Sequence, residues 1–117
     1  MKTKLRKISL KSLGIKEVKY CTDSFSKGLG LMFSRRNNNK ALVMEFNKEQ
    51  KVPLHMWFVF YPIDVLYLDE NKKVVEIIKN FRPFTFYFPE KKAKHVVELP
   101  ANSVHKGQLE VDDTIVL

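Results

Sequence analysis

An acidic side chain, Asp64, stands inside the most apolar stretch of the chain. This stretch, HMWFVFYPIDVLYLD, begins at His55 and ends at Asp69. Burying a carboxylate without a partner is costly, so Asp64 must accept hydrogen bonds from backbone amides, meet a cation, or lie at an edge. Because Pro62 fixes its own φ and lacks an N–H donor, a bend or a strand edge is expected there. In the structural interpretation, Asp64 accepts hydrogen bonds from amides left free at this bend.

In the functional interpretation, Asp64 belongs to a site that binds a small polar ligand. The candidate ligand-binding residues are Arg35, His55, Asp64 and Glu98. A further alternative is a small hydrolase-like enzyme that uses the carboxylates near Asp64 and Glu98. Sequence alone leaves the structural and the functional interpretation of Asp64 open.

Other site chemistries find little support. His55, His95 and His105 are far apart, and no two of them have the spacing of metal ligands. Cys21 is the only cysteine and is more typical of a small buried thiol than of a nucleophile. The segment KGLGL lacks the third glycine and the lysine-serine end of a phosphate loop. We therefore expect no metal, no cofactor and no catalytic residue. The expected function is that of a non-catalytic module that binds a small polar ligand or a protein.

Length and composition favour one globular domain over residues 1–117. The chain is 44% hydrophobic and 29% charged, which is typical of a soluble protein with a real core. A single cysteine cannot form an internal disulfide, which fits a reducing compartment. No secretory signal and no apolar run of membrane-spanning length is visible. We therefore expect a cytoplasmic protein without a membrane partner.

The net charge of +8 is concentrated at the N-terminus. Residues 1–16 contain six Lys or Arg residues and no acid, so they form a basic arm or an edge strand. Such an arm attracts nucleic acid or anionic surfaces, but it also fits a solvated or strand-forming tail. The alternative function is therefore RNA or single-stranded DNA binding through the arm and nearby aromatic rings. Its candidate residues are Lys4, Arg6, Lys7, Lys11, Arg82 and Tyr87.

Aromatic residues gather in two segments, 57–67 and 81–88. In the second segment, FRPFTFYF, Phe84, Phe86 and Phe88 alternate with Thr85 and Tyr87. Aromatic faces flanked by bases bind single strands in small barrels, but alternating phenylalanines also fill barrel cores. We expect these three phenylalanines in the core, and Tyr87, on the opposite parity, to be the exposed ring.

The hydrophobic pattern predicts a mainly β fold. Residues 57–68 are apolar on both parities, which indicates a strand buried on both faces. A polar turn at 69–73 predicts a hairpin with Asn71 at positive φ. We expect a small, partly closed, antiparallel-type β-barrel with one or two short helical turns, after Asp23 and near 101–106. The other expected strands cover 17–22, 42–46, 74–78, 84–88, 94–99 and 110–116.

Three motifs resemble a prokaryotic family known as domain of unknown function 192 (DUF192). They are GLGLMFSRR, LHMWFVFYPIDVLYLDENKKVVEI and NFRPFTFYFPEKKAKHVVELPANSV, and the matching core covers about residues 27–117. The resemblance implies a compact, mainly β, barrel-like domain. Val59 replaces a usual methionine, Asn102 replaces a glycine after ELPA, and VDD replaces a valine-glycine-aspartate turn. Since Asn and Asp can adopt left-handed geometry, we expect the fold to be kept.

Overall fold

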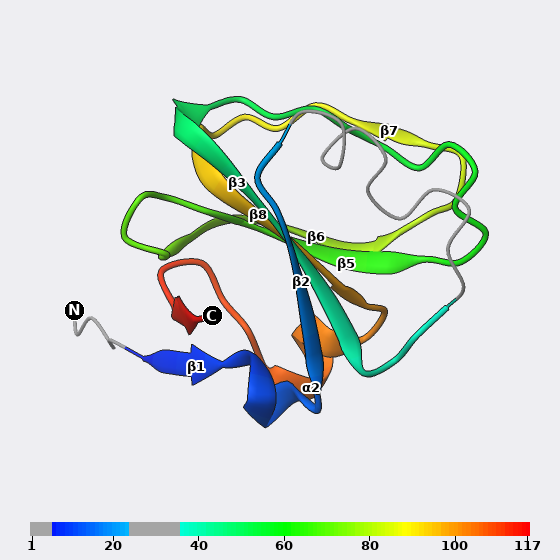
Figure 1. Ribbon diagram of the computed structural model, residues 1–117, viewed down its shortest axis with the longest axis horizontal. Helices are drawn as coiled ribbons and strands as arrows, with labels where there is room; N and C mark the ends of the chain where they lie inside the picture. Colours follow the sequence, from blue (N-terminus) through cyan, green and yellow to red (C-terminus); the bar gives the residue numbers. More distant parts are fainter. Residues whose placement is uncertain (1–5, 24–35) are drawn as a thin grey trace.

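A computed structural model describes residues 6–23 and 36–117 of the chain (Figure 1). Strands dominate this part, and helix is confined to two short elements, so the expected mainly β class is confirmed. In chain order, the elements are β1 (Lys7–Ser9), the 3-10 helix η1 (Leu10–Leu13), β2 (Glu17–Cys21), β3 (Lys40–Gln50), β4 (Leu54–His55), β5 (Ile63–Leu68), β6 (Val74–Phe81), β7 (Phe86–Tyr87), β8 (Ala93–Pro100), α2 (Ser103–Gly107) and β9 (Thr114–Val116).

The central sheet has five strands in the order β2-β3-β8-β5-β6. The β2–β3 pair is parallel, and the other three pairs are antiparallel. Two small sheets accompany it, a parallel β1–β9 pair and an antiparallel β4–β7 pair. In the described chain the outer strands β2 and β6 do not pair with each other. The expected barrel closure is therefore not confirmed, and the sheet is mixed rather than purely antiparallel.

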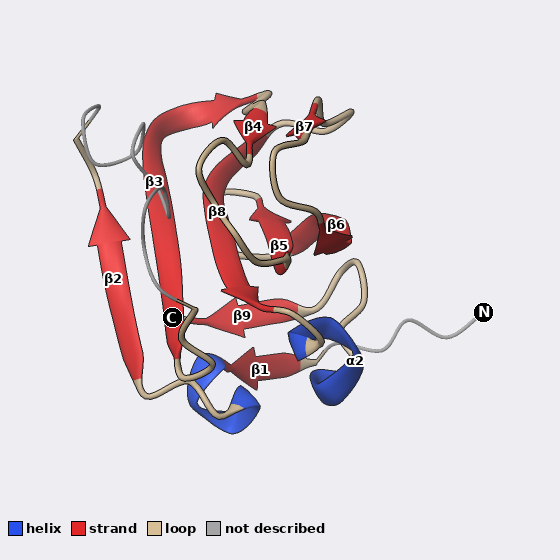
Figure 2. Cartoon of the chain, turned by 90° about the vertical axis from the view of Figure 1, so that its right-hand side faces the viewer, coloured by secondary structure: helices blue, strands red, loops and turns tan. Residues whose placement is uncertain are grey.

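Each face of the central sheet is covered by its own hydrophobic cluster. The first face packs against β4, β7 and the 56–62 loop, and the second packs against η1, α2 and β9 (Figures 1 and 2). β5 is buried at every position because it lies between these two layers. On β5, Val65 and Tyr67 belong to the first cluster, whereas Leu66 and Leu68 belong to the second. The prediction of a strand buried on both faces is confirmed for residues 63–68.

Two aromatic predictions are wrong. The strand expected from Trp57 begins only at Ile63, and residues 56–62 form a loop. Phe84, Phe86 and Phe88 are exposed rather than buried. Alternation correctly places side chains on one face of a segment, but it does not say which face the rest of the protein covers.

Tyr87, expected to be exposed, instead packs against the first cluster. Its hydroxyl donates a hydrogen bond to Glu76 Oε2. This hydrogen bond, with burial, raises the pKa of Tyr87 to about 12. The ring is therefore held on the core side of β7.

The turns show where the backbone needs left-handed geometry. Asn102 (φ 73°) and Asp112 (φ 81°) adopt it at the two positions where glycine was expected from the resemblance. In the β5–β6 hairpin the positive φ falls on Lys72 and not on Asn71. The reason is that Asp69 Oδ1 accepts hydrogen bonds from the amides of Asn71 and Lys73, at 2.8 and 2.9 Å, which fixes the turn.

The helical turn expected near 101–106 is observed as α2. The helical piece expected after Asp23 lies outside the described residues, as do Lys4 and Arg35. None of the helices formed by residues 6–23 and 36–117 is long and apolar enough to cross a membrane.

Candidate ligand-binding site

Glu98 is a carboxylate at the middle of the sheet. It lies on the central strand β8, and its cross-strand neighbours are Leu42 on β3 and Val65 on β5. Only 7% of the residue is exposed. No described residue gives its Oε1 atom a hydrogen bond. Loss of water contact raises the pKa of Glu98 to about 7, so the group changes charge near neutral pH.

A cavity of about 400 Å³ opens beside Glu98. The cavity lies where β3 and β5 begin and where β8 ends. The residues just before β3 also line it. This volume is within the range of small-molecule sites. The lining residues combine basic, amide, aromatic and aliphatic groups: Arg36, Asn37, Lys40, Ala41, Leu42, Tyr61, Ile63, Glu98, Leu99 and Pro100.

Basic side chains stand at the loop side of this cavity. The loop turns tightly because Asn37 Oδ1 accepts a hydrogen bond from the Asn39 amide at 2.8 Å. After this turn, Lys40 occupies the first position of β3. The Lys40 ammonium lies 3.9 Å from Glu17 Oε2, and Arg36 is exposed. A ligand in the cavity would therefore meet a carboxyl group at Glu98 and positive charge at the loop.

Asp64 has a different environment from Glu98. Its Oδ1 accepts a hydrogen bond from the Asn80 amide and its Oδ2 accepts one from the Val104 amide, both at 2.9 Å. Asn80 lies at an irregularity in the β5–β6 pairing and has a positive φ. Val104 lies in the first turn of α2, whose N-cap residue Asn102 makes no side-chain cap. Asp64 thus accepts backbone hydrogen bonds, as its structural interpretation expects, but the amides belong to Asn80 and Val104 and not to the bend at Pro62.

Asp64 and Glu98 face opposite sides of the sheet. Asp64 is opposite Leu99 and Glu98 is opposite Val65, so adjacent strands place them on alternate parities. His55 does not line the cavity either, and its ring accepts a hydrogen bond from the Trp57 amide at 3.2 Å. The fourth candidate, Arg35, lies outside the described residues. Of the three candidates that the structure describes, only Glu98 lines the cavity.

Sequence reasoning missed the basic and aromatic lining residues Arg36, Lys40 and Tyr61. The available signal for Arg36 and Lys40 was the high density of bases and amides in the segment RRNNNK. Nothing in the sequence marked Tyr61, because it stands among four other aromatic residues. No three His, Cys, Asp or Glu side chains in the described part of the chain are close enough to share a metal ion.

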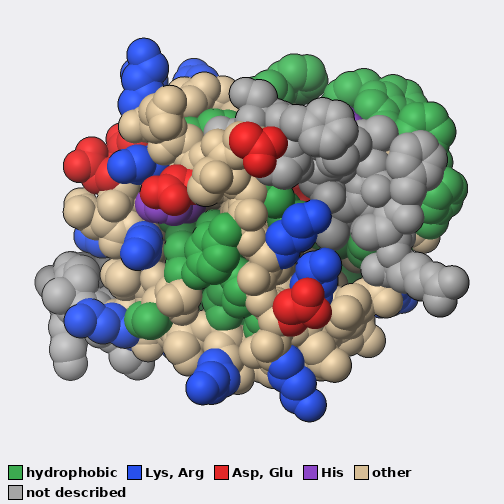
Figure 3. Space-filling model, viewed as in Figure 1, with side chains coloured by type: hydrophobic (Ala, Val, Ile, Leu, Met, Phe, Trp, Pro, Cys, Tyr) green, Lys and Arg blue, Asp and Glu red, His purple; other side chains and the backbone are tan. Residues whose placement is uncertain are grey.

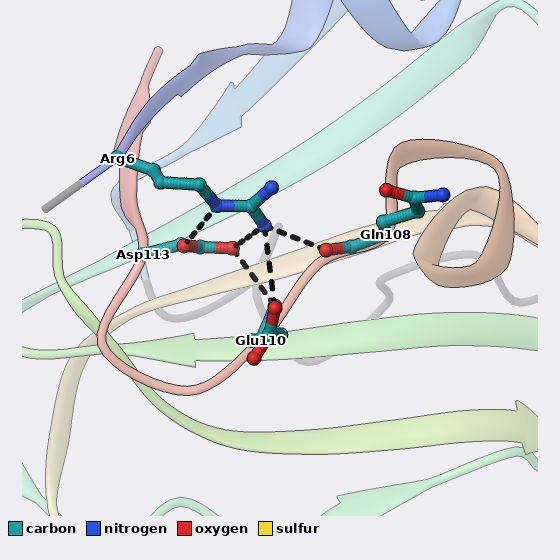
Figure 4. Close-up of polar contacts among 4 residues, drawn as sticks. All are labelled: Arg6, Gln108, Glu110 and Asp113. Atoms are coloured by element: carbon teal, nitrogen blue, oxygen red, sulfur yellow. Dashed lines mark hydrogen bonds and ion pairs between the residues drawn. The ribbon is translucent and has the colours of Figure 1, made fainter. Parts of the chain in front are cut away.

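The basic arm is partly built into the fold. Arg6 donates from Nε to Asp113 Oδ1 at 2.9 Å and from Nη2 to Asp113 Oδ2 at 2.6 Å (Figure 4). It also donates to the Gln108 carbonyl at 2.6 Å and lies 4.0 Å from Glu110. Lys7 follows in β1. Arg6 thus ties β1 to the segment before β9, and its charge is neutralised there.

The nucleic-acid candidates that the structure describes do not form one surface. Lys7 and Lys11, in β1 and η1, lie on the side of the second cluster, whereas Arg82 and Tyr87 lie on the side of β4 and β7 (Figure 1). The central sheet separates the two groups. The described part of the arm and the aromatic segments therefore do not share one face that could bind a nucleic acid.

The fold and the cavity define a small, mainly β protein with a mixed five-stranded sheet and a buried acid beside a cavity, and no described residue gives the Oε1 atom of this acid a hydrogen bond. The chain belongs to the DUF192 family, whose model, described as an uncharacterised ACR, matches residues 7–117. This confirms the resemblance seen in the three motifs. The family carries no assigned activity, so function must be argued from the site.

Relatives and solved structures agree with this assignment. A UPF0127 protein of Thermococcus sibiricus is 35% identical over 100 residues, which cover 84% of this chain and 64% of that relative. One of Pyrococcus furiosus is 30% identical over 99 residues, covering 85% of this chain and 84% of the relative. A candidate transcription regulator from Sinorhizobium meliloti has a similar crystal structure, with a TM-score of 0.77 at 20% identity over 81% of this chain and 76% of that one. This last likeness shows the fold alone.

Proposed function

We propose that the protein is a non-catalytic module that binds a small polar ligand in the Glu98 cavity. The observation that carries this proposal is a buried carboxyl oxygen that has no hydrogen-bond partner in the described chain. Buried polar atoms in native proteins are almost always partnered, and groups with strongly perturbed pKa values cluster at functional sites. A ligand donor that reaches the Glu98 carboxyl group would supply the missing hydrogen bond.

The cavity lining restricts the ligand chemistry. Leu42 and Ile63 offer apolar contact to the body of a ligand. Arg36 and Lys40 favour an acceptor or an anionic group at the loop side. The ionised Glu98 carboxylate favours an ammonium or amide donor at the opposite end. A small amine with an acceptor group, such as an amino acid, satisfies all three requirements.

The hydrolase-like alternative receives no comparable support. It needs two carboxyl groups that face a common space. Asp64 and Glu98 point to opposite faces of the sheet, and both Asp64 oxygens accept backbone hydrogen bonds. Binding without catalysis is therefore the function that this geometry supports best.

Calorimetric titration with amino acids and simple primary amines tests the proposal. We expect a ligand whose affinity for wild type is about tenfold higher at pH 8 than at pH 6, since Glu98 with a pKa near 7 is mostly ionised only at the higher pH. Glu98→Gln should abolish this pH dependence and weaken binding. Glu70→Gln, which alters an exposed acid in the β5–β6 turn, is the matched control. If wild type and Glu98→Gln bind every tested amine alike, the site is wrong.

A further inference from the structure

Six aromatic side chains form an exposed cluster that neither the core nor the Glu98 cavity uses. We call this cluster the aromatic surface. Its members come from the loop between β4 and β5 and from the segment around β7, which β4–β7 pairing brings together. Phe60, Phe86 and Phe88 are 65%, 55% and 75% exposed. The aromatic surface consists of Trp57, Phe58, Phe60, Phe84, Phe86 and Phe88.

The rings of the aromatic surface contact one another. Phe84 lies at the centre, with edge contacts to Trp57 at 6.1 Å, Phe58 at 6.1 Å and Phe60 at 5.4 Å between ring centroids. Trp57 also contacts Phe86 at 5.2 Å. Phe86 in turn stacks on Phe88 at 6.5 Å, so the six rings form one continuous apolar patch. The other contacts are edge contacts, so the rings pack against one another and are not separate parallel platforms for stacking bases.

The backbone holds two of these rings in place at a conformational cost. Phe58 and Phe84 have φ values of 57° and 60°. Positive φ is unusual for bulky residues, and such strain persists where the surrounding structure imposes it, often at functional positions. Figure 3 shows apolar side chains protruding along the margin of the molecule on the β7 side, where they form a convex edge. A convex apolar edge is suited to insertion into a partner.

The charges next to the aromatic surface indicate an anionic partner. Segments 51–62 and 82–92 contain four Lys or Arg residues and one acid, Glu90. All four bases, Lys51, Arg82, Lys91 and Lys92, are exposed. This excess of positive charge disfavours association with a second copy through the same surface, since like charges would meet.

We propose that the aromatic surface is a docking site for an anionic lipid bilayer. Exposed aromatic side chains insert at the membrane interface, and flanking Lys and Arg residues are attracted to anionic headgroups. The engaged rings and the convex shape favour this partner over a single-stranded nucleic acid. The proposal departs from the sequence-based expectation of no membrane partner, and it is independent of ligand binding at Glu98.

Trp57 is the only tryptophan of the chain and lies within the aromatic surface, so its fluorescence reports docking directly. Full-length protein is titrated with phosphatidylcholine vesicles that contain or lack phosphatidylglycerol. We expect a blue shift and quenching by brominated lipid with the anionic vesicles, both weakened by salt. An unchanged Trp57 spectrum with these vesicles overturns the proposal. So does a response to oligothymidylate in the absence of any vesicle response.

Matched variants separate the contributions of rings and charges. Phe60→Ser with Phe88→Ser, at the two most exposed rings, should weaken vesicle partition more than about tenfold. Tyr20→Ser, at an exposed aromatic residue on β2, should not. Lys91→Glu with Lys92→Glu should reduce binding to anionic vesicles, whereas Lys16→Glu with Lys19→Glu should reduce it less. Vesicle binding that is insensitive to the Phe60 and Phe88 changes contradicts the assigned surface, and circular dichroism checks that each variant is folded.

Discussion

Each face of the central sheet buries one carboxylate, and the two carboxylates differ in the hydrogen bonds that they accept. On the second face, Asp64 accepts two backbone hydrogen bonds and joins β6 to α2. On the first face, Glu98 is surrounded by Leu42 and Val65, and its Oε1 lacks a described partner. Burial alone therefore does not identify a functional acid. The number of hydrogen bonds that each carboxylate receives separates a structural role from a candidate binding role.

The largest effect is expected from Asp64→Ala. This change leaves the amides of Asn80 and Val104 without acceptors, and each stranded donor costs about 1–3 kcal/mol. We expect the free energy of unfolding in urea to fall by about 3 to 4 kcal/mol. Asp64→Asn keeps one acceptor oxygen and should lose about half as much. An alanine variant as stable as wild type would refute the structural role.

Glu98 should make stability depend on pH. Its pKa is raised from 4.5 to about 7 in the folded state. Between these values the folded protein holds a proton that the unfolded chain has released, so stability falls as pH rises through this window. We expect this contribution to reach about 2 to 3 kcal/mol by pH 8. The measurement is the difference between wild type and Glu98→Gln in urea unfolding at pH 5 and pH 8, and parallel curves would contradict it.

A leucine scan of the two acids should give effects of opposite sign. At pH 8, Glu98→Leu removes a buried charge whose Oε1 atom accepts no hydrogen bond from the described residues, and it should stabilise the fold by about 1 kcal/mol. Asp64→Leu should destabilise it, because the two amides lose their acceptors. Thermal unfolding of both variants measures the contrast. If both changes lower the melting temperature, the distinction between the two faces does not hold.

The smallest effect concerns the start of α2. Asn102 has a φ of 73° and makes no side-chain cap, so Asn102→Gly should relieve strain and be neutral or stabilising by about 0.5 kcal/mol. Asn102→Ala keeps the strain and should be destabilising. A large loss of stability in the glycine variant, measured by urea unfolding, would show that Asn102 shares the capping role assigned here to Asp64.

Some local features of the fold were predictable from the sequence, whereas the positive φ of Lys72 and the start of β5 at Ile63 were not. Pro62 ends a loop and β5 is buried on both faces, as the apolar run and the proline indicate. Asn102 and Asp112 adopt left-handed geometry because short polar side chains tolerate it. The cost of burying a carboxylate correctly indicated that Asp64 needs partners, but it left open whether these are backbone amides or a ligand.

Features that depend on long-range pairing were not predictable. The separation of Asp64 from Glu98 is set by the register that places Asp64 opposite Leu99, and sequence parity within each strand cannot supply it. The exposure of Phe84 and Phe88 was missed for the same reason. Their alternation shows that they share one face, but the sequence does not show whether another element packs against that face. Parallel β1–β9 and β2–β3 pairing carries no local sequence signal at all.

The parallel β1–β9 pairing has a consequence for synthesis on the ribosome. Lys7–Ser9 are synthesised about a hundred residues before their partners Thr114–Val116. During that interval β1 has no strand to pair with. Asp113, whose carboxylate accepts hydrogen bonds from Arg6, has not yet been synthesised. We expect the nascent chain to complete its sheets only after Thr114–Val116 have left the tunnel, so β1 stays accessible to chaperones until then.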